Sequence, residues 1–138
     1  MISFIFLWVC MMTMARTPRE TVEEFFERMA DPDERESVGE LFADDAVITV
    51  PGARFSGPEA AASFLAFLEP RYERAGKAFG RWTVAGNRVV SQGTLYGVDN
   101  DGEPFEEVRY VDVYEVDEGA IARLDVYNDL AVEGVVEP

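Results

Sequence analysis

Asp112 is the residue of this sequence best placed to do chemistry, because it stands among aromatic and aliphatic neighbours. The segment YVDVY at 110–114 alternates, so Asp112 shares one face of a strand with Tyr110 and Tyr114, while the two valines share the other. A carboxyl group on a buried face has a raised pKa and can donate a hydrogen bond to a ligand oxygen or transfer a proton. The other interpretation is a structural aspartate that is hydrogen-bonded to a tyrosine or to Trp82. The sequence leaves both interpretations open.

Residue types that the sequence lacks exclude several other kinds of site. The chain has no histidine, which excludes Ser-His-Asp and Cys-His nucleophiles and the usual zinc sites. Its only cysteine is Cys10, so the chain forms no intramolecular disulfide. No glycine-rich nucleotide motif and no carboxylate spacing typical of a metal site is present. We therefore expect no metal and no cofactor.

The charge balance is strongly acidic, with 27 acidic against 12 basic residues and a net charge of −15. Such a surface repels nucleic acid phosphates and anionic lipid, so we expect neither nucleic acid nor a membrane as a partner. Only one of the basic residues, Lys77, is a lysine. An acidic surface that is poor in lysine is typical of cytoplasmic proteins of salt-loving organisms, so we expect a halophilic, cytoplasmic protein.

The first fifteen residues, MISFIFLWVCMMTMA, are apolar but too short to span a bilayer, and they lack the basic start and cleavage site of a signal peptide. We interpret residues 1–15 as an N-terminal extension from a start codon placed too early, with Met12 or Met14 as the true start. A degraded membrane-targeting segment and an extra strand or packing arm are the alternatives. The remaining length fits one domain, which we place at 16–132, followed by an acidic tail at 133–138.

Helix signals dominate the first part of this domain. The sequence TPRE at 17–20 is a capping box with proline at the first helical position, and it predicts a helix that continues to about Met29. The sequences DPD at 31–33 and SGPE at 56–59 predict two further helix starts, and Pro70 is expected to end the third helix. Between the second and third helices we expect a short strand at 46–50.

In the second part of the domain, apolar and polar residues alternate in segments that are separated by turn residues. Turn residues at 86–87, 100–102 and 117–119 separate predicted strands at 78–85, 88–98, 104–116 and 120–129. Because short hairpins connect them, these strands are expected to be antiparallel neighbours. Helices followed by a meander of long strands indicate an α+β fold. We expect a cone, in which a curved antiparallel sheet with about three helices on its concave side leaves one pocket.

Three segments of the chain resemble the nuclear transport factor 2-like superfamily, which includes SnoaL-like polyketide cyclases, ketosteroid isomerases and limonene-epoxide hydrolases. They are LFADDAVITVPG at 41–52, SGPEAAASFL at 56–65 and YEVDEGAIARLDVYND at 114–129. The resemblance covers about residues 18–130 and implies the cone-shaped fold. It implies less about the reaction, because this fold carries many chemistries and includes several non-enzymes.

The resemblance gives this chain only part of the catalytic residues of those enzymes. Similarity to ketosteroid isomerases places their general base at Val50 and their tyrosine donor at Phe26, and neither side chain can transfer a proton. The same similarity places their second donor, a protonated aspartate, at Asp112. Similarity to the cyclases and epoxide hydrolases places their last-strand aspartate at Val126, with Asp125 on the opposite face of the strand unless a bulge turns it into the pocket.

From the residues and the resemblance together we predict a protein that binds a compact, mostly apolar molecule carrying a carbonyl or hydroxyl group. Asp112 is the expected catalytic acid or base, and the sequence leaves open whether the protein is a cofactor-independent isomerase, cyclase or hydrolase. The alternative is a non-catalytic binding or dimerisation module. A homodimer is expected because dimers recur in the resembled families. The expected ligand-binding residues are Tyr110, Asn128, Tyr114, Trp82, Phe26, Val50 and Val126.

Overall fold

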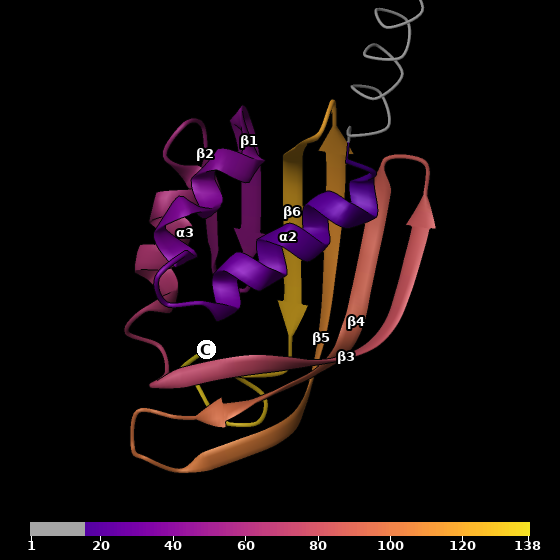
Figure 1. The fold of residues 1–138 in the computed structure, drawn as a ribbon. Helices are drawn as coiled ribbons and strands as arrows, with labels where there is room; N and C mark the ends of the chain where they lie inside the picture. The colour runs from indigo at the N-terminus through magenta and orange to yellow at the C-terminus, as the bar shows by residue number, and fades with distance from the viewer. Residues whose placement is uncertain (1–15) are drawn as a thin grey trace, which may run out of the picture.

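The computed structural model describes residues 16–138, so the expected N-terminal extension at 1–15 lies outside the described residues. Two α-helices, α2 and α3, and one 3-10 helix, η1, accompany the strands in this range. Figure 1 shows α2 crossing the sheet while α3 lies beside β1 and β2. In chain order the elements are α2 (Pro18–Ala30), η1 (Arg35–Leu41), β1 (Phe42–Val50), β2 (Ala53–Ser56), α3 (Ala60–Leu68), β3 (Arg74–Ala85), β4 (Arg88–Val98), β5 (Pro104–Asp117) and β6 (Ala120–Asn128).

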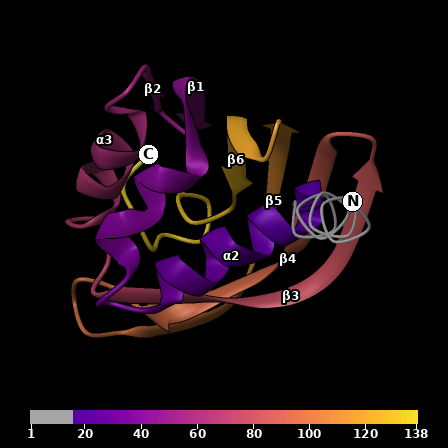
Figure 2. The ribbon, with the colours of Figure 1, turned by 45° about the horizontal axis from the view of Figure 1, so that its top comes forward.

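The strands form one six-stranded sheet in the order β2-β1-β6-β5-β4-β3. The three predicted hairpins are present, and they make β3, β4, β5 and β6 antiparallel neighbours. The sheet is mixed rather than wholly antiparallel, because β1 runs parallel to β6. The sheet curves strongly around α2, which lies in its hollow (Figure 2). The predicted α+β cone is therefore confirmed.

The structure differs from the predicted elements mainly at the ends of strands. The first strand begins at Phe42 rather than at residue 46, because Phe42 already pairs with Ile121 before the register shifts. After Pro51 the chain folds back as β2, a strand that the sequence analysis did not predict, and pairs with β1. The second predicted helix is a 3-10 helix. The strand expected from residue 78 begins at Arg74.

Helix α2 covers the concave face of the sheet with its apolar side. The predicted capping box is present: the Thr17 hydroxyl accepts from the Glu20 backbone N–H, and the Glu20 carboxylate accepts from the Thr17 N–H. This cap starts the helix so that Val22, Phe25 and Phe26 face the strands. These side chains belong to the first apolar cluster, whose buried members are Val22, Phe25, Phe26, Val38, Leu41, Ile48, Val50, Ala60, Phe64, Val89, Tyr114, Val116, Ile121 and Leu124.

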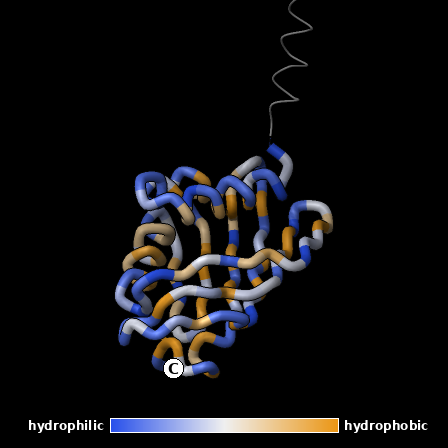
Figure 3. The backbone as a smooth tube through the Cα atoms, turned by 60° about the horizontal axis from the view of Figure 1, so that its bottom comes forward, coloured by the Kyte–Doolittle hydropathy of each residue, from blue (hydrophilic) through white to orange (hydrophobic). Residues whose placement is uncertain are grey.

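A second apolar cluster fills the other end of the concave face. Its buried members are Leu95, Val108, Tyr110 and Leu130. Hydrophobic and hydrophilic residues alternate along the strands (Figure 3), as expected for a sheet with one buried side. Val135 and Val136, in the segment predicted to be an acidic tail, pack against this cluster. The chain end is thus folded onto the domain at these two residues.

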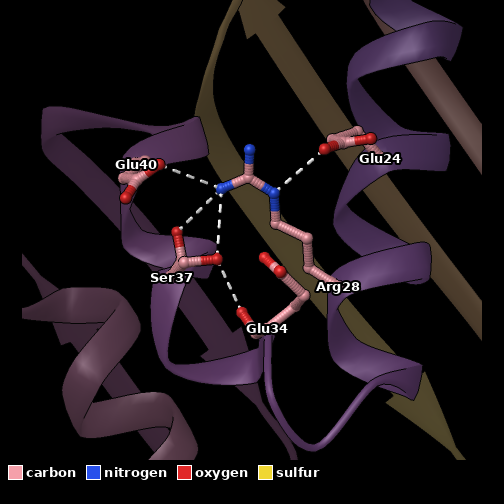
Figure 4. Close-up of polar contacts among 5 residues, drawn as sticks. All are labelled: Glu24, Arg28, Glu34, Ser37 and Glu40. Atoms are coloured by element: carbon pink, nitrogen blue, oxygen red, sulfur yellow. Dashed lines mark hydrogen bonds and ion pairs between the residues drawn. The ribbon is translucent and has the colours of Figure 1, made fainter.

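Arg28 joins α2 to η1 through several polar contacts (Figure 4). Its Nε donates to Glu24 Oε1 at 3.0 Å, and its NH1 group donates to the Ser37 carbonyl oxygen at 3.1 Å and to Glu40 Oε1 at 3.1 Å. The Ser37 hydroxyl accepts a further bond from NH1 at 3.2 Å. Because the Arg28 side chain is 17% exposed, these bonds are partly shielded from water.

Replacing Arg28 with alanine is expected to lower the free energy of unfolding by about 2 kcal/mol, because hydrogen bonds to charged groups contribute more than neutral ones. Arg19 is the control on the same helix, since it is 48% exposed, forms one ion pair with Glu23 at 3.6 Å and lies 4.7 Å from the centre of the Trp82 ring. Arg19→Ala should cost less than about 1 kcal/mol. Urea unfolding followed by circular dichroism measures both variants. Equal losses in the two would show that the Arg28 contacts contribute no more than a surface pair.

Candidate functional site

Asp112 lies near the middle of β5, on the concave face of the sheet. The strand register places it beside Ser91 of β4 on one side and Val126 of β6 on the other. Asp112 is 2% exposed, so water hardly reaches its carboxyl group. Tyr110 and Tyr114, which share this face, belong to the second and the first apolar cluster respectively. Asp112 is therefore a polar group on the boundary between two apolar clusters.

The Asp112 carboxyl group makes few and long hydrogen bonds for a buried polar group. Its Oδ2 atom lies 3.4 Å from the Tyr114 hydroxyl and 3.4 Å from Lys77 Nζ. Charge-assisted hydrogen bonds are ordinarily about 2.7–2.9 Å long, so both contacts are weak. The Oδ1 atom is buried and has no hydrogen-bond partner within residues 16–138. Such an unpartnered buried atom is uncommon, and a ligand group can satisfy it.

Lys77 is the functional candidate that the sequence analysis missed. It lies on β3, and its side chain is 28% exposed, against 3% for the side chain of Asp112. Its Nζ atom lies 4.8 Å from the centre of the Tyr110 ring and 5.2 Å from the centre of the Phe26 ring. The predicted strand began at residue 78, which left Lys77 outside the sheet. Extending that strand by four residues would have placed Lys77 on it.

The buried hydroxyl groups near Asp112 form a second polar contact. Ser91 is fully buried, and its Oγ lies 2.9 Å from the Tyr110 hydroxyl oxygen. Burial raises the pKa of Tyr110, and the hydrogen bond to Ser91 partly opposes that rise. Burial also raises the pKa of Tyr114 well above its ordinary value, and the negative charge of Asp112 adds to the rise. Both phenols are therefore neutral hydrogen-bond donors at ordinary pH.

Burial raises the pKa of the Asp112 carboxyl group, while the positive charge and hydrogen bond of Lys77 act in the opposite direction. Desolvation is the larger of these effects, because the carboxylate loses its hydration shell and regains only long contacts. Asp112 therefore holds a proton more readily than an ordinary aspartate. A carboxyl group in this state can donate a hydrogen bond or exchange a proton with a neighbouring group.

The remaining residues expected to bind a ligand have mostly apolar surroundings. Phe26 and Trp82 pack edge to face, with ring centres 5.7 Å apart. Val50 is buried in the first cluster, and Trp82 and Val126 pack against that cluster. Asn128 lies on the concave face by register with Tyr110, but its Oδ1 already accepts from the Leu130 N–H at 3.1 Å. Asn128 thus fixes the turn that follows β6.

Asp125 lies on the outer face of the sheet, opposite to Asp112. Its register partner on β5 is Val113, which belongs to the outward row. The Thr49 hydroxyl donates to Asp125 Oδ1 at 2.6 Å, and Arg123 Nε donates to Oδ2 at 2.9 Å. Although desolvation acts against it, these partners lower the pKa of Asp125. Asp125 is therefore a satisfied carboxylate away from the concave face.

A hollow of about 650 Å³ is found mainly over the outer face of the sheet, rather than around Asp112. Most of its lining residues occupy strand positions on the outer face of the sheet, opposite to Asp112. Tyr110 and Asn128 also contribute to it, where the strands bend. No group of three acidic or cysteine side chains that could hold a metal ion occurs in the described part of the chain. The lining residues are Gly80, Arg81, Gln92, Gly93, Thr94, Arg109, Tyr110, Val111, Tyr127, Asn128 and Asp129.

A comparison with known families matches residues 22–124 to the SnoaL-like domain. The chain belongs to the SnoaL-like domain family. This membership confirms the resemblance seen in the sequence, and the matched residues lie inside the expected domain at 16–132. A comparison with curated proteins gave no match. No helix within residues 16–138 is long and apolar enough to cross a membrane.

Solved structures share the fold of this SnoaL-like domain at low sequence identity. A nuclear transport factor 2-like protein of unknown function from Burkholderia pseudomallei K96243 is 18% identical, with a TM-score of 0.76 over 88% of this chain and 98% of its own. TerC, crystallised with polyporic acid, is 18% identical, with a TM-score of 0.75 over the same shares. A proposed SnoaL-like polyketide cyclase from Jannaschia sp. CCS1 is 24% identical, with a TM-score of 0.73 over 88% of this chain and 92% of its own.

Proposed function

We propose that this SnoaL-like protein binds a compact, mostly apolar molecule with a carbonyl or hydroxyl group at Asp112, on the concave face of the sheet. The observation that carries the proposal is the buried Oδ1 atom of Asp112, which lacks a partner within residues 16–138. An unsatisfied buried polar atom costs about 1–3 kcal/mol, which a ligand hydrogen bond offsets. Protonated Asp112 donates to a carbonyl oxygen, and ionised Asp112 accepts from a hydroxyl group.

The aromatic residues around Asp112 support an apolar ligand. The Tyr114 hydroxyl contacts the carboxyl group, and Tyr110 shares its face of β5. Phe26 belongs to the neighbouring first cluster, and Trp82 packs against that cluster. Asp112 itself is nearly closed to solvent and the more exposed Lys77 contacts it, so we expect a ligand to approach the carboxyl group beside Lys77. TerC was crystallised with polyporic acid, and this compound belongs among the molecules to test.

Proton transfer is the reaction that this site supports. Asp112 would give or take the proton, because its raised pKa lies closer to neutral pH than that of an exposed aspartate. Tyr110 would orient the ligand with its hydroxyl group. An isomerisation, a cyclisation or a water addition can proceed in this way without an organic cofactor. These reactions would be cofactor-independent, as proposed from the sequence.

A non-catalytic binding or dimerisation module is the second candidate function. It is favoured by Val50 and Val126, which hold the positions where related enzymes are expected to carry acids. The outer face of the sheet exposes Tyr127 at 57%, which suits a contact between two copies of the chain. The homodimer, the halophilic origin and the cytoplasmic location stay predictions. Sizing at high salt measures the first of them.

A thermal-shift screen in molar potassium chloride tests the proposed ligand site. The compounds are steroids, terpenoid epoxides, polyketide-like phenols, short hydroxy acids and polyporic acid. A compound that binds only the folded state at about 100 times its Kd stabilises it by about 2.7 kcal/mol, which shifts the midpoint by several degrees. We expect such a shift in the wild type and its loss in Asp112→Asn.

Asp125→Asn is the matched control, because it removes the same charge on the opposite face of the neighbouring strand. Each variant is compared with its own midpoint without ligand, so a change in basal stability does not affect the result. The control should keep the full ligand shift. A shift of equal size in Asp112→Asn would contradict the placement of the ligand at Asp112. No shift with any compound would favour the non-catalytic module.

A further inference from the structure

Lys77 is the polar group that an incoming ligand meets before Asp112. Its side chain is 28% exposed, whereas that of Asp112 behind it is 3% exposed. The Nζ atom lies near the rings of Tyr110 and Phe26, at 4.8 Å and 5.2 Å from their centres. The Lys77 amine is therefore partly exposed to solvent, lies near two aromatic rings and contacts a carboxyl group.

The contact between Lys77 and Asp112 does not have the geometry of a purely structural ion pair. A buried pair offsets the loss of hydration only when the contact is short and the remaining oxygen lone pairs are satisfied. Here Nζ and Oδ2 are 3.4 Å apart, and Oδ1 has no partner in the described chain. The Oδ1 atom can therefore accept a hydrogen bond from, or donate one to, a third polar group that lies beside the Lys77 amine.

We propose that Lys77 forms an imine with an aldehyde or ketone, with Asp112 as the group that moves the protons. The proposal rests on the proposed function, because it names the carbonyl group of the same ligand as the reacting atom. It goes beyond that function by adding a covalent step at a residue which the family resemblance does not assign. A lysine amine that lies against aromatic rings and beside a proton acceptor is suited to this chemistry.

The step balances without any further reactant. Asp112 takes one proton from the Lys77 ammonium, and the free amine attacks the carbonyl carbon to form a C–N bond. The carbonyl oxygen then takes that proton and becomes the hydroxyl group of a carbinolamine. A second proton moves from nitrogen through Asp112 to the hydroxyl group, which leaves as water. The third proton of the original ammonium stays on nitrogen, so the product is a protonated imine that holds the carbon by a C=N bond, and water can reverse the reaction.

Reductive trapping with benzaldehyde and sodium borohydride tests this inference on the full chain. Borohydride reduces an imine to a stable amine, so the protein gains one benzyl group at the reacting nitrogen. Lys77 is the only lysine of the sequence, so peptide mapping by mass spectrometry separates it from the N-terminal amine. We expect one benzyl group at Lys77 in the folded wild type, and at least about tenfold slower trapping in Asp112→Asn.

Three controls decide the result. Asp125→Asn should trap at the wild-type rate, and Lys77→Arg should show no benzyl group at position 77. Wild type unfolded in guanidinium gives the rate of an ordinary lysine, which the folded protein should exceed. Trapping only at the N-terminal amine, or at Lys77 with the same rate in Asp112→Asn or in the unfolded chain, would overturn the proposal.

A ligand that cannot form an imine separates this inference from the proposed function. Benzyl alcohol has the ring of benzaldehyde but a hydroxyl group in place of the carbonyl group. An Asp112-dependent thermal shift with benzyl alcohol, without trapping of benzaldehyde at Lys77, would leave the ligand site standing and reject the imine. Trapping at Lys77 that is accelerated by Asp112 supports both.

Discussion

Lys77→Met is expected to lower the free energy of unfolding by about 3 kcal/mol at a pH of about 8, because it leaves the buried Asp112 carboxylate without its positive partner. Methionine has a similar length and packs well against the rings of Phe26 and Tyr110. The variant therefore removes the charge with little loss of packing. Only the long contact of the Tyr114 hydroxyl, at 3.4 Å, remains to the Asp112 carboxyl group.

The size of this effect should depend on pH in a defined direction. Burial raises the pKa of folded Asp112 above its unfolded value of about 4, so the folded state binds the proton more tightly. The stability that this proton contributes is fully present below the unfolded pKa and is lost as the pH rises through the folded pKa. Removing Lys77 raises that folded pKa further, so the loss grows toward high pH and shrinks below a pH of about 4.

Urea unfolding of both proteins across a pH series measures the difference between them. The steepest slope should be about 1.4 kcal/mol per pH unit for one proton. Titration of the many surface acids cancels in the difference, because both proteins carry them. The double variant Lys77→Met with Asp112→Asn should lose the pH dependence. A loss of stability that is the same at every pH would show that Lys77 acts through packing and not through its charge.

The features of the fold that could be predicted from the sequence are those set by neighbouring residues. The capping box at 17–20 fixed the start of α2, and the glycine turns at 86, 102 and 119 gave three hairpins. Alternation along 110–114 placed Asp112 on one face of the strand with Tyr110 and Tyr114, and the family resemblance indicated that this face is the buried one. Each of these signals lies within a few residues of the structure it specifies.

The features that could not be predicted depend on pairing between distant segments. β2 is a strand because its four residues pair with β1, and the alternation in its own sequence, ARFS, is too short to indicate a strand without that pairing. Lys77 was missed because β3 begins at Arg74 rather than at residue 78, and its side chain reaches Asp112 across the intervening β4. Asn128 was expected to face a ligand, but a backbone N–H two residues later occupies its oxygen. The partner of Lys77 thus comes from a distant strand, whereas that of Asn128 is set locally by the turn after β6.

Gly93→Ala is expected to destabilise the fold by about 3 kcal/mol or more, because the added methyl group meets backbone atoms that cannot move alone. A Cβ atom at this position would lie 2.3 Å from the Ala78 carbonyl oxygen and 2.8 Å from the Gly80 nitrogen. The register between β3 and β4 shifts next to this point, between Phe79 and Arg81. Glycine at 93 therefore allows the close approach of two strands where the sheet bends.

The same substitution should also disturb the candidate site, because the affected residues adjoin it. Ala78 follows Lys77 directly, and the added Cβ would lie 3.2 Å from Cε1 of Tyr110. Gly39→Ala is the matched control, since its Cβ would meet only the Ala61 methyl group at 3.8 Å, and it should change stability by less than about 1 kcal/mol. Thermal unfolding and benzaldehyde trapping measure both variants. A Gly93→Ala protein with wild-type stability would show that the bend accommodates a side chain, and wild-type trapping would show that Lys77 keeps its place without that glycine.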